Sequence, residues 1–457
     1  MSLLRTISPL LGLLALSASA VSYSSAAQAN KVELSAELGH GIIDRSAKDT
    51  VYLRLSLKAL AARDRDRRAP INVALVIDRS GSMQGDRLAA AKKGVEAALD
   101  RLGPDDTVSL VAYNHEVDVL LEAGRLGSKR DAAGRAIRQL RAQGTTALYA
   151  GVKEGGAQVG EFRSDMKVNR VVLLSDGLAN VGPSTPREVA ELGRKLAGKG
   201  ISVSTIGLGL EYNDELMQRL AGVSDGNHVF VERPSDLAEI FDREFGDALS
   251  IAARDVTITI ECEAGFKPKR VLGRDADISG SRVTLNLAQL QADNERYVIV
   301  ELEPEGSYSA DDLKDVARVD VGYIDLDTGS RSSVATDVQA RFTDNAKEAE
   351  GSVNKGVMSQ VTEQIATENS ERAVELRNQG DIAGAKKVLM DNAAYLGRNK
   401  DVLGTGASPA SSASLSVLGE LEEKSREAAE SLDEDDWERT RRAMRYDQHK
   451  SKVQQAY

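Results

Sequence analysis

Two short segments near the N-terminus alternate apolar and polar residues. They are residues 31–38 (Lys-Val-Glu-Leu-Ser-Ala-Glu-Leu) and residues 51–57 (Val-Tyr-Leu-Arg-Leu-Ser-Leu). Because successive side chains of a strand point to opposite faces of a sheet, this alternation predicts two strands with one buried face each. A run of charged residues, 63–68, follows them. Such a run is typical of a solvated boundary, so we assign residues 30–67 to an N-terminal strand segment.

Between residues 68 and 250 the pattern changes to short apolar runs that alternate with amphipathic helical segments. The runs expected to form strands are 72–77, 107–112, 117–121, 170–174, 201–206 and 228–231. The segments expected to form helices are 87–102, 131–140, 147–159, 188–197, 215–220 and 235–245. Largely apolar strands that alternate with helices indicate an α/β domain with a doubly wound, mostly parallel sheet.

The helical pattern stops after residue 250, and residues 251–343 have the pattern of an antiparallel β-sandwich. The segments expected to form its strands are 256–260, 282–287, 296–302 and 317–324. We predict that the strands within residues 31–57 join this sandwich. The α/β domain would then be inserted in the sandwich, and the alternative is that the sandwich simply follows it.

The rest of the chain is predicted to be helical again. Residues 344–398 form a helical hairpin around the turn Gln379-Gly380-Asp381, similar to a single tetratricopeptide-like unit that acts as a cap. Residues 399–414, rich in Gly, Ser and Ala at their end, are assigned to a linker. Residues 415–457 are predicted to form a C-terminal helix, which either docks on the protein surface or binds a partner. Its apolar positions are Leu418, Leu421, Ala428 and Leu432.

Composition and charge limit the classes of partner. The chain has 457 residues, of which 4% are aromatic, and its net charge is -11. This length implies more than one domain. An acidic protein with few aromatic residues lacks both the positive surface that binds phosphates and the stacking surface that binds bases. We therefore expect no nucleic-acid partner.

The N-terminus has the features of a secretory signal peptide. Arg5 is followed by the apolar run 10–16 and by two small-residue cleavage sites, one after Ala20 and one after Ala29. We assign residues 1–29 to the signal and keep both sites open. No later apolar run reaches the roughly 20 residues of a membrane helix, and Cys262 is the single cysteine. The expected product is an exported protein, periplasmic or secreted, with no transmembrane segment after cleavage.

Candidate chemistry is concentrated where the predicted parallel strands end. The apolar run 73–77 leads into Asp78-Arg-Ser-Gly-Ser-Met83, so Asp78, Ser80 and Ser82 can converge from one turn. Thr146 starts a predicted helix, and Asp176 follows another apolar strand. Loops at the carboxyl ends of parallel strands bind ligands. Carboxylate and hydroxyl oxygens are hard donors that suit Mg²⁺, so these residues predict a site for a divalent cation.

This set of residues resembles the metal-ion-dependent adhesion site of von Willebrand factor type A domains. The shared pattern is Asp-x-Ser-x-Ser, a downstream Thr and a strand that ends in Asp-Gly, and the resemblance covers about residues 70–250. The flanking β segments are similar to those of bacterial homologues of the calcium-activated chloride channel proteins and of the inter-alpha-trypsin inhibitor heavy chains. The family's common Gly-Gly-Thr is Gly144-Thr145-Thr146 here. We assign Thr146, with Thr145 as the alternative.

The resemblance implies a role for each residue. Ser80, Ser82 and Thr146 would bind the cation through their hydroxyls, and Asp78 and Asp176 would act through water or as hydrogen-bond acceptors. Mg²⁺ is the expected cation, with Mn²⁺ or Ca²⁺ as alternatives. Neutral hydroxyls leave much of the ion's charge unbalanced, so an acidic group of a protein partner can complete the coordination. The implied function is metal-dependent, adhesion-type protein binding.

An enzyme is not expected. Within the sequence we find no phosphate-binding loop, no Gly-x-Ser-x-Gly nucleophile elbow and no His-Glu-x-x-His zinc motif. The histidines are scattered along the chain, at His40, His115, His228 and His449. The alternative function is a structural or assembly protein of the cell envelope in which the metal only stabilises the fold.

Overall fold

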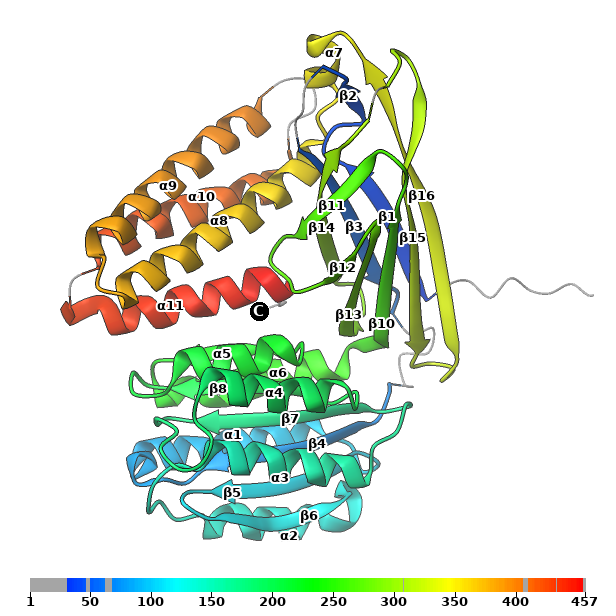
Figure 1. The fold of residues 1–457 in the computed structure, drawn as a ribbon. Helices are drawn as coiled ribbons and strands as arrows, with labels where there is room; N and C mark the ends of the chain where they lie inside the picture. Colours follow the sequence, from blue (N-terminus) through cyan, green and yellow to red (C-terminus); the bar gives the residue numbers. More distant parts are fainter. Residues whose placement is uncertain are drawn as a thin grey trace, which may run out of the picture.

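The computed structural model describes residues 31–46, 50–61, 68–306, 308–405, 410–432 and 434–454. The predicted signal peptide with both cleavage sites, most of the charged run and part of the predicted linker lie outside the described residues. Figure 1 shows an α/β domain, a β-sandwich and a group of long helices. The last of these helices, at the C-terminus, lies between the other long helices and the α/β domain.

The α/β domain is built on a sheet with the strand order β6-β5-β4-β7-β8-β9. All neighbouring strands are parallel except β5 and β6, which confirms a mostly parallel sheet. Every residue of the central strands β4 and β7 is buried, as their largely apolar sequences predict. The strands are β4 (Ile71–Asp78), β5 (Thr107–Tyr113), β6 (Val117–Arg125), β7 (Val168–Ser175), β8 (Ser202–Leu208) and β9 (His228–Val231).

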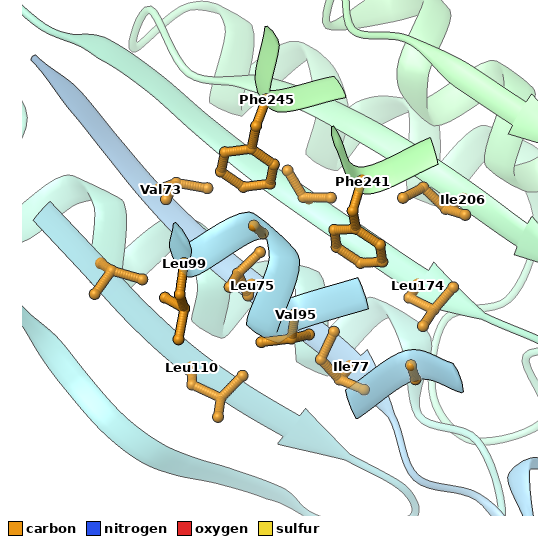
Figure 2. Packing of buried hydrophobic residues seen from close by; sticks show 14 of the residues in the cluster. Val73, Leu75, Ile77, Val95, Leu99, Leu110, Leu174, Ile206, Phe241 and Phe245 are labelled. Atoms are coloured by element: carbon orange, nitrogen blue, oxygen red, sulfur yellow. The ribbon is translucent and has the colours of Figure 1, made fainter. Parts of the chain in front are cut away.

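Helices cover both faces of this sheet. One face packs against α1 (Asp86–Arg101), α2 (Leu126–Gln139) and α6 (Leu237–Leu249), and Figure 2 shows Phe241 and Phe245 of α6 among the strand side chains. The other face packs against α3 (Leu148–Glu161), α4 (Pro186–Ala197) and α5 (Asp214–Val223). Short 3₁₀ turns occupy Gly81–Met83 and Pro234–Asp236. The sheet is therefore doubly wound, as predicted.

The β-sandwich consists of two sheets. The first has the order β1-β3-β14-β11 and contains β1 (Val32–Leu38), β3 (Val51–Ala59), β14 (Glu295–Pro304) and β11 (Phe266–Val271). The second has the order β12-β13-β10-β15-β16-β2 and contains β12 (Asp277–Ser279), β13 (Arg282–Gln291), β10 (Ile251–Cys262), β15 (Leu313–Asp325), β16 (Arg331–Thr343) and β2 (Ile42–Asp44). Their inner faces share one apolar core.

The α/β domain is inserted in this sandwich. The N-terminal strand β3 pairs antiparallel with β14, and Leu55 lies opposite Val298 in the register. The chain leaves the sandwich after β3 and returns to it at β10, which follows α6 directly. The pairing confirms the predicted participation of the N-terminal strands. The sequence analysis missed β2, β11, β12 and β16; the first half of β16 has no buried residue, which weakens its hydrophobic signal.

The C-terminal region differs from the sequence prediction in two places. It contains α7 (Ala346–Gly351), α8 (Lys355–Asn378), α9 (Ile382–Gly404), α10 (Ser412–Glu430) and α11 (Glu434–Val453). The predicted linker at 399–414 is wrong at both ends, because α9 continues to Gly404, where it buries Leu403 against Leu418, and α10 begins at Ser412. The single helix predicted at 415–457 is also wrong. It is broken after α10, and Trp437 at the start of α11 packs back into a cluster with Leu389.

Helix α11 docks on the α/β domain. Arg441 and Arg445 both form ion pairs with Asp214, which is 3% exposed at the start of α5. Arg442 donates to the backbone oxygen of Tyr212, and the ring of His449 lies 2.9 Å from the carbonyl oxygen of Gly226. The chain's last described helix is therefore a docked helix that joins the long helices to the α/β domain. Figure 1 shows it between the two.

Candidate functional site

The predicted site residues lie at one edge of the α/β sheet. Asp78 ends β4, Asp176 directly follows β7, and Thr146 lies just before α3. Strands β4 and β7 are adjacent, and from β4 the chain adds β5 on one side and β7 on the other. The site is therefore at the topological switch point of the sheet, where open α/β sheets bind their ligands.

Three hydroxyl groups converge around Gly177. A methyl group added at the Cβ position of Gly177 would lie 3.3 Å from Thr146 Oγ1, 3.4 Å from Ser82 Oγ and 3.9 Å from Ser80 Oγ. The hydroxyl oxygens of Ser80 and Ser82 are 3.0 Å apart. Glycine at 177 leaves this space free of a side chain. The structure thus brings the three predicted hydroxyls together from two loops, and Gly177 closes the cradle from a third.

Asp78 is fully buried and is held by neutral donors. Its Oδ1 accepts from the backbone N–H of Ser80 at 2.8 Å, and its Oδ2 accepts from the hydroxyls of Ser175 at 2.6 Å and Tyr113 at 3.4 Å. Desolvation raises the pKa of Asp78 to about 6, although the hydrogen bonds from Ser175 and Ser80 partly oppose the shift. A buried carboxylate without a cationic hydrogen-bond partner gains by the approach of a metal ion.

Asp176, also fully buried, has a different set of partners. Its Oδ1 accepts from the Ser82 hydroxyl at 2.7 Å, and its Oδ2 accepts from Arg87 Nη1 at 2.8 Å. Arg87 also contacts Glu211, which belongs to the loop after β8. Asp176 therefore orients one predicted hydroxyl ligand while it forms an ion pair with the first turn of α1.

The loop that carries Thr146 is fixed by backbone contacts. Asn180 Oδ1 accepts from Thr146 N at 2.8 Å, and the N–H groups of Asn180 and Val181 donate to Thr146 O. Gly144 has φ +77°, and its carbonyl oxygen accepts from Gly81 N at 2.9 Å. Thr146 is 3% exposed with its hydroxyl in the cradle. Thr145 is exposed to solvent, so the geometry favours Thr146 over the alternative.

Several residues around the site were not identified from the sequence. Ser175 holds Asp78, Asn180 holds the Thr146 loop, and Arg87 holds Asp176. Ser175 and Asn180 flank the Asp-Gly of the motif, so their positions could have suggested a role. Arg87 lies on the predicted helix 87–102 and carries no signal in a single sequence, because its partner Asp176 is 89 positions away.

The residues present fit a hard divalent cation. The cradle offers hydroxyl oxygens, with two buried carboxylates behind them, and oxygen donors of this kind suit Mg²⁺, Mn²⁺ or Ca²⁺. Within the part of the chain that the structure describes, no cluster of three or more His, Cys, Asp or Glu is arranged to hold a metal. The role of these residues as metal ligands stays a prediction.

Comparison with known proteins finds a family model for the segment that holds the site. The model of the von Willebrand factor type A domain matches residues 72–243, the segment that forms the α/β domain. Members of the family commonly take part in protein–protein interactions. The predicted likeness to inter-alpha-trypsin inhibitor heavy chains is confirmed: heavy chain H3 of Homo sapiens is 26% identical over 36% of this chain and 19% of its own length.

Two bacterial relatives match this chain over a longer segment and at a higher identity than the human heavy chain does. The protein sll0103 of Synechocystis is 28% identical over 60% of this chain, and YfbK of Escherichia coli is 30% identical over 42% of it. This chain spans 66% of the length of the first relative and 33% of the second. The similarity therefore includes bacterial proteins as well as the animal heavy chains.

Solved structures share the full architecture and not only the α/β domain. A von Willebrand factor type A protein from Catenulispora acidiphila has a TM-score of 0.67 at 18% identity and covers 89% of this chain and 91% of its own. The ArnB paralog VWA2 from Sulfolobus acidocaldarius has a TM-score of 0.59 at 16% identity and covers 93% and 98%. The likeness establishes the fold: the α/β domain, antiparallel sheets and C-terminal helices together.

Two further predictions from the sequence concern membrane-spanning segments and enzymatic activity. None of the helices in the described residues combines the length and apolar character needed to cross a membrane. The family likeness does not decide whether the chain catalyses a reaction. The expectation that it is not an enzyme therefore stays a prediction.

Proposed function

We propose that this protein is an exported binding protein that holds a divalent cation at the end of β4 and β7 and uses it to bind an acidic group of a protein partner. Mg²⁺ is the favoured cation, with Mn²⁺ or Ca²⁺ as alternatives. Ser80, Ser82 and Thr146 supply hydroxyls, while Asp78 and Asp176 balance the charge from behind. The observation that carries the proposal is the convergence of these hydroxyls within 3.9 Å of one point.

The exposure of the site supports a role in binding a partner. Ser82 is exposed to solvent, whereas Ser80, Thr146 and both carboxylates are buried. A cation in the cradle would therefore be held from the protein side and open on the other. Since its nearest ligands are neutral hydroxyls, an incoming carboxylate would form a strong bond to it. The site would select a partner with an exposed Asp or Glu.

We expect Mg²⁺ to stabilise the folded protein. A ligand that binds only the folded state adds about 2.7 kcal/mol to the free energy of unfolding at 100 times its Kd. The measurement is thermal unfolding in EDTA and at increasing Mg²⁺, with Mn²⁺ and Ca²⁺ compared. Asp78→Ala is expected to abolish the rise in Tm, and Ser82→Ala to reduce it by removing one ligand.

The matched control is Ser128→Ala. Ser128 is an exposed serine of the same domain, and its hydroxyl donates only to the carbonyl oxygen of Arg125, at the opposite end of the strands. It should keep the full response to the cation. Because each variant is compared with itself in EDTA, any change in its intrinsic stability does not affect the comparison. A wild-type protein whose Tm is the same with and without all three cations contradicts the proposal.

Export is proposed from the N-terminal sequence. We expect the mature protein, produced from the full chain in a bacterial host, to begin at Val21 or Asn30, after one of the two small-residue sites. The intact mass of protein recovered from the periplasm or medium distinguishes these two products. A product that keeps residues 1–20 and stays with the cytoplasmic fraction is incompatible with export.

A second candidate function is a structural or assembly role in the cell envelope. It is favoured by the docked helix α11 and by the contact of Val357 and Val361 of α8 with the sandwich, which make the long helices and both domains one assembly. In this role the cation would only stabilise the sheet edge. Capture of a partner that survives both EDTA and Asp78→Ala would support the structural role over the metal-dependent one.

A further inference from the structure

Arg87 is placed where the local energetics of a helix disfavour it. It is the second residue of α1, whose N-cap is Gly85, without a side-chain hydrogen bond at the cap. The N-terminus of a helix carries a partial positive charge, so a cationic side chain in the first turn is unfavourable there. The position of Arg87 is therefore explained by its tertiary contacts, which are with Asp176 and Glu211.

The ion pair between Arg87 and Asp176 joins a half-buried cation to a fully buried carboxylate. Asp176 is 0% exposed, whereas Arg87 is 29% exposed. The carboxylate divides its two oxygens between the site and the arginine: Oδ1 accepts from the Ser82 hydroxyl and Oδ2 accepts from Arg87. Arg87 neutralises part of the negative charge of Asp176. A cation in the cradle would otherwise neutralise that part.

The neighbouring carboxylate has no such partner. The donors that reach Asp78 in the described structure are the neutral groups of Ser80, Ser175 and Tyr113. Of the hydrogen bonds described for Asp78 and Asp176, the bond from Arg87 is therefore the one with a positively charged donor. Glu211, which is 69% exposed, lies 3.1 Å from the same Nη1 atom and gives the guanidinium a second acceptor outside the site.

We propose that Arg87 is a resident counter-ion of Asp176 that holds the site in shape and lowers its affinity for the divalent cation. The proposal rests on the proposed cation site and names the residue that sets its strength. The positive charge of Arg87 has two effects. Without a cation, the guanidinium offsets the repulsion between two buried carboxylates. With a cation bound, the two positive charges repel each other in a poorly solvated place, where such repulsion is large.

The test is to remove the charge of Arg87 and measure two quantities. Arg87→Gln keeps a hydrogen-bond donor near Asp176 but carries no charge. We expect its Mg²⁺ affinity, measured by calorimetric titration of the full mature chain, to rise about tenfold. We also expect its Tm in EDTA to fall below that of the wild type, so that its Mg²⁺-dependent rise in Tm becomes larger.

Two further variants separate charge from geometry and position. Arg87→Lys retains the positive charge and should keep an Mg²⁺ affinity within about threefold of the wild type. Arg101→Gln removes an arginine from the other end of the same helix, where it pairs with the exposed Asp242. It should leave the Mg²⁺ affinity unchanged and lower the Tm in EDTA only by the small amount that an exposed ion pair contributes.

The outcomes distinguish this proposal from the one on which it rests. An Arg87→Gln protein that binds Mg²⁺ as the wild type does, or more weakly, overturns the counter-ion role, and weaker binding would mean that Arg87 only positions Asp176. Equal behaviour of the Lys and Gln variants also overturns it. A wild type without any response to the cation refutes the proposed function itself, whereas a responsive wild type with an unchanged Arg87→Gln refutes only the role of Arg87.

Discussion

Replacing Glu244 with alanine is expected to lower the free energy of unfolding by about 3–5 kcal/mol, because it leaves a buried arginine without its counter-ion. Arg170 of β7 and Glu244 of α6 are each 1% exposed, and Arg170 Nη1 lies 2.6 Å from Glu244 Oε1. Asn227 donates to the other carboxylate oxygen at 2.8 Å. The pair connects the sheet to α6, the helix that leads into the sandwich. Its loss should therefore destabilise both the sheet and this helix. Chemical denaturation of wild type and variant measures the difference.

Two variants serve as controls for this prediction. Glu239→Ala removes a carboxylate from the same helix, where it pairs with Arg243 on the surface, and exposed pairs of this kind contribute about 0.3–0.5 kcal/mol. The double variant Arg170→Met, Glu244→Leu removes both charges and should recover most of the lost stability. If Glu244→Ala costs no more than Glu239→Ala, the pair is not buried in the way described.

Acid is expected to weaken the docking of α11 through His449. Burial, as the largest cause, lowers the pKa of His449 to about 4, and burial also holds the pKa of His228 well below its usual value. The two rings meet edge to face at 5.9 Å between centroids. An unfolded histidine titrates near pH 6.5. The unfolded chain therefore binds more protons than the folded one between pH 6.5 and 4, and stability falls as the pH decreases through that window.

The contribution of His449 to this loss is about 3 kcal/mol between pH 7 and pH 4. The charged groups that influence its ring are Asp225, Lys452 and Arg274. Asp78 and Asp247, whose burial raises their pKa values to about 6, act in the opposite direction, because their neutral forms are favoured in the fold. The measurement is therefore the difference between wild type and His449→Gln, in urea unfolding at each pH.

The controls for the acid effect lie in the same chain. His115→Gln changes an exposed histidine, and its stability should follow that of the wild type at every pH. His449→Gln can still donate to the carbonyl oxygen of Gly226, so it should fold and lose less stability in acid. Parallel pH curves for wild type and His449→Gln would show that His449 titrates normally and that α11 is not docked through a buried ring.

Helix α11 connects the long C-terminal helices to the loop that borders the candidate site. Helix α11 contacts Tyr212, in the loop after β8, and Asp214, the first residue of α5; Glu211 of the same loop contacts Arg87. The site and the docked helix therefore hold the same short loop from two sides. A change in the docking of α11 is expected to alter the conformation of this loop more than that of the rest of the sheet.

Much of the architecture could be predicted from hydrophobic periodicity. Strands such as 72–77 and 170–174 are largely apolar because both of their faces are covered by helices, and this burial is visible in the sequence. The strands at 31–38 and 51–57 alternate because one face meets the core of the sandwich. The break between α10 and α11 was missed, because it depends on Trp437 packing against helices that are distant in sequence.

The sequence by itself determined which residues could form the candidate site. Asp78, Ser80 and Ser82 are close along the chain after a buried strand, so a local turn is enough to bring them together. The meeting of this turn with Thr146 and Asp176 follows only from the order in which the strands pair. The partners of the carboxylates, Ser175 for Asp78 and Arg87 for Asp176, were decided by the tertiary structure alone. The physical reason is that burial and side-chain direction set the charge balance of the site, and neither is a property of a residue's place in the sequence.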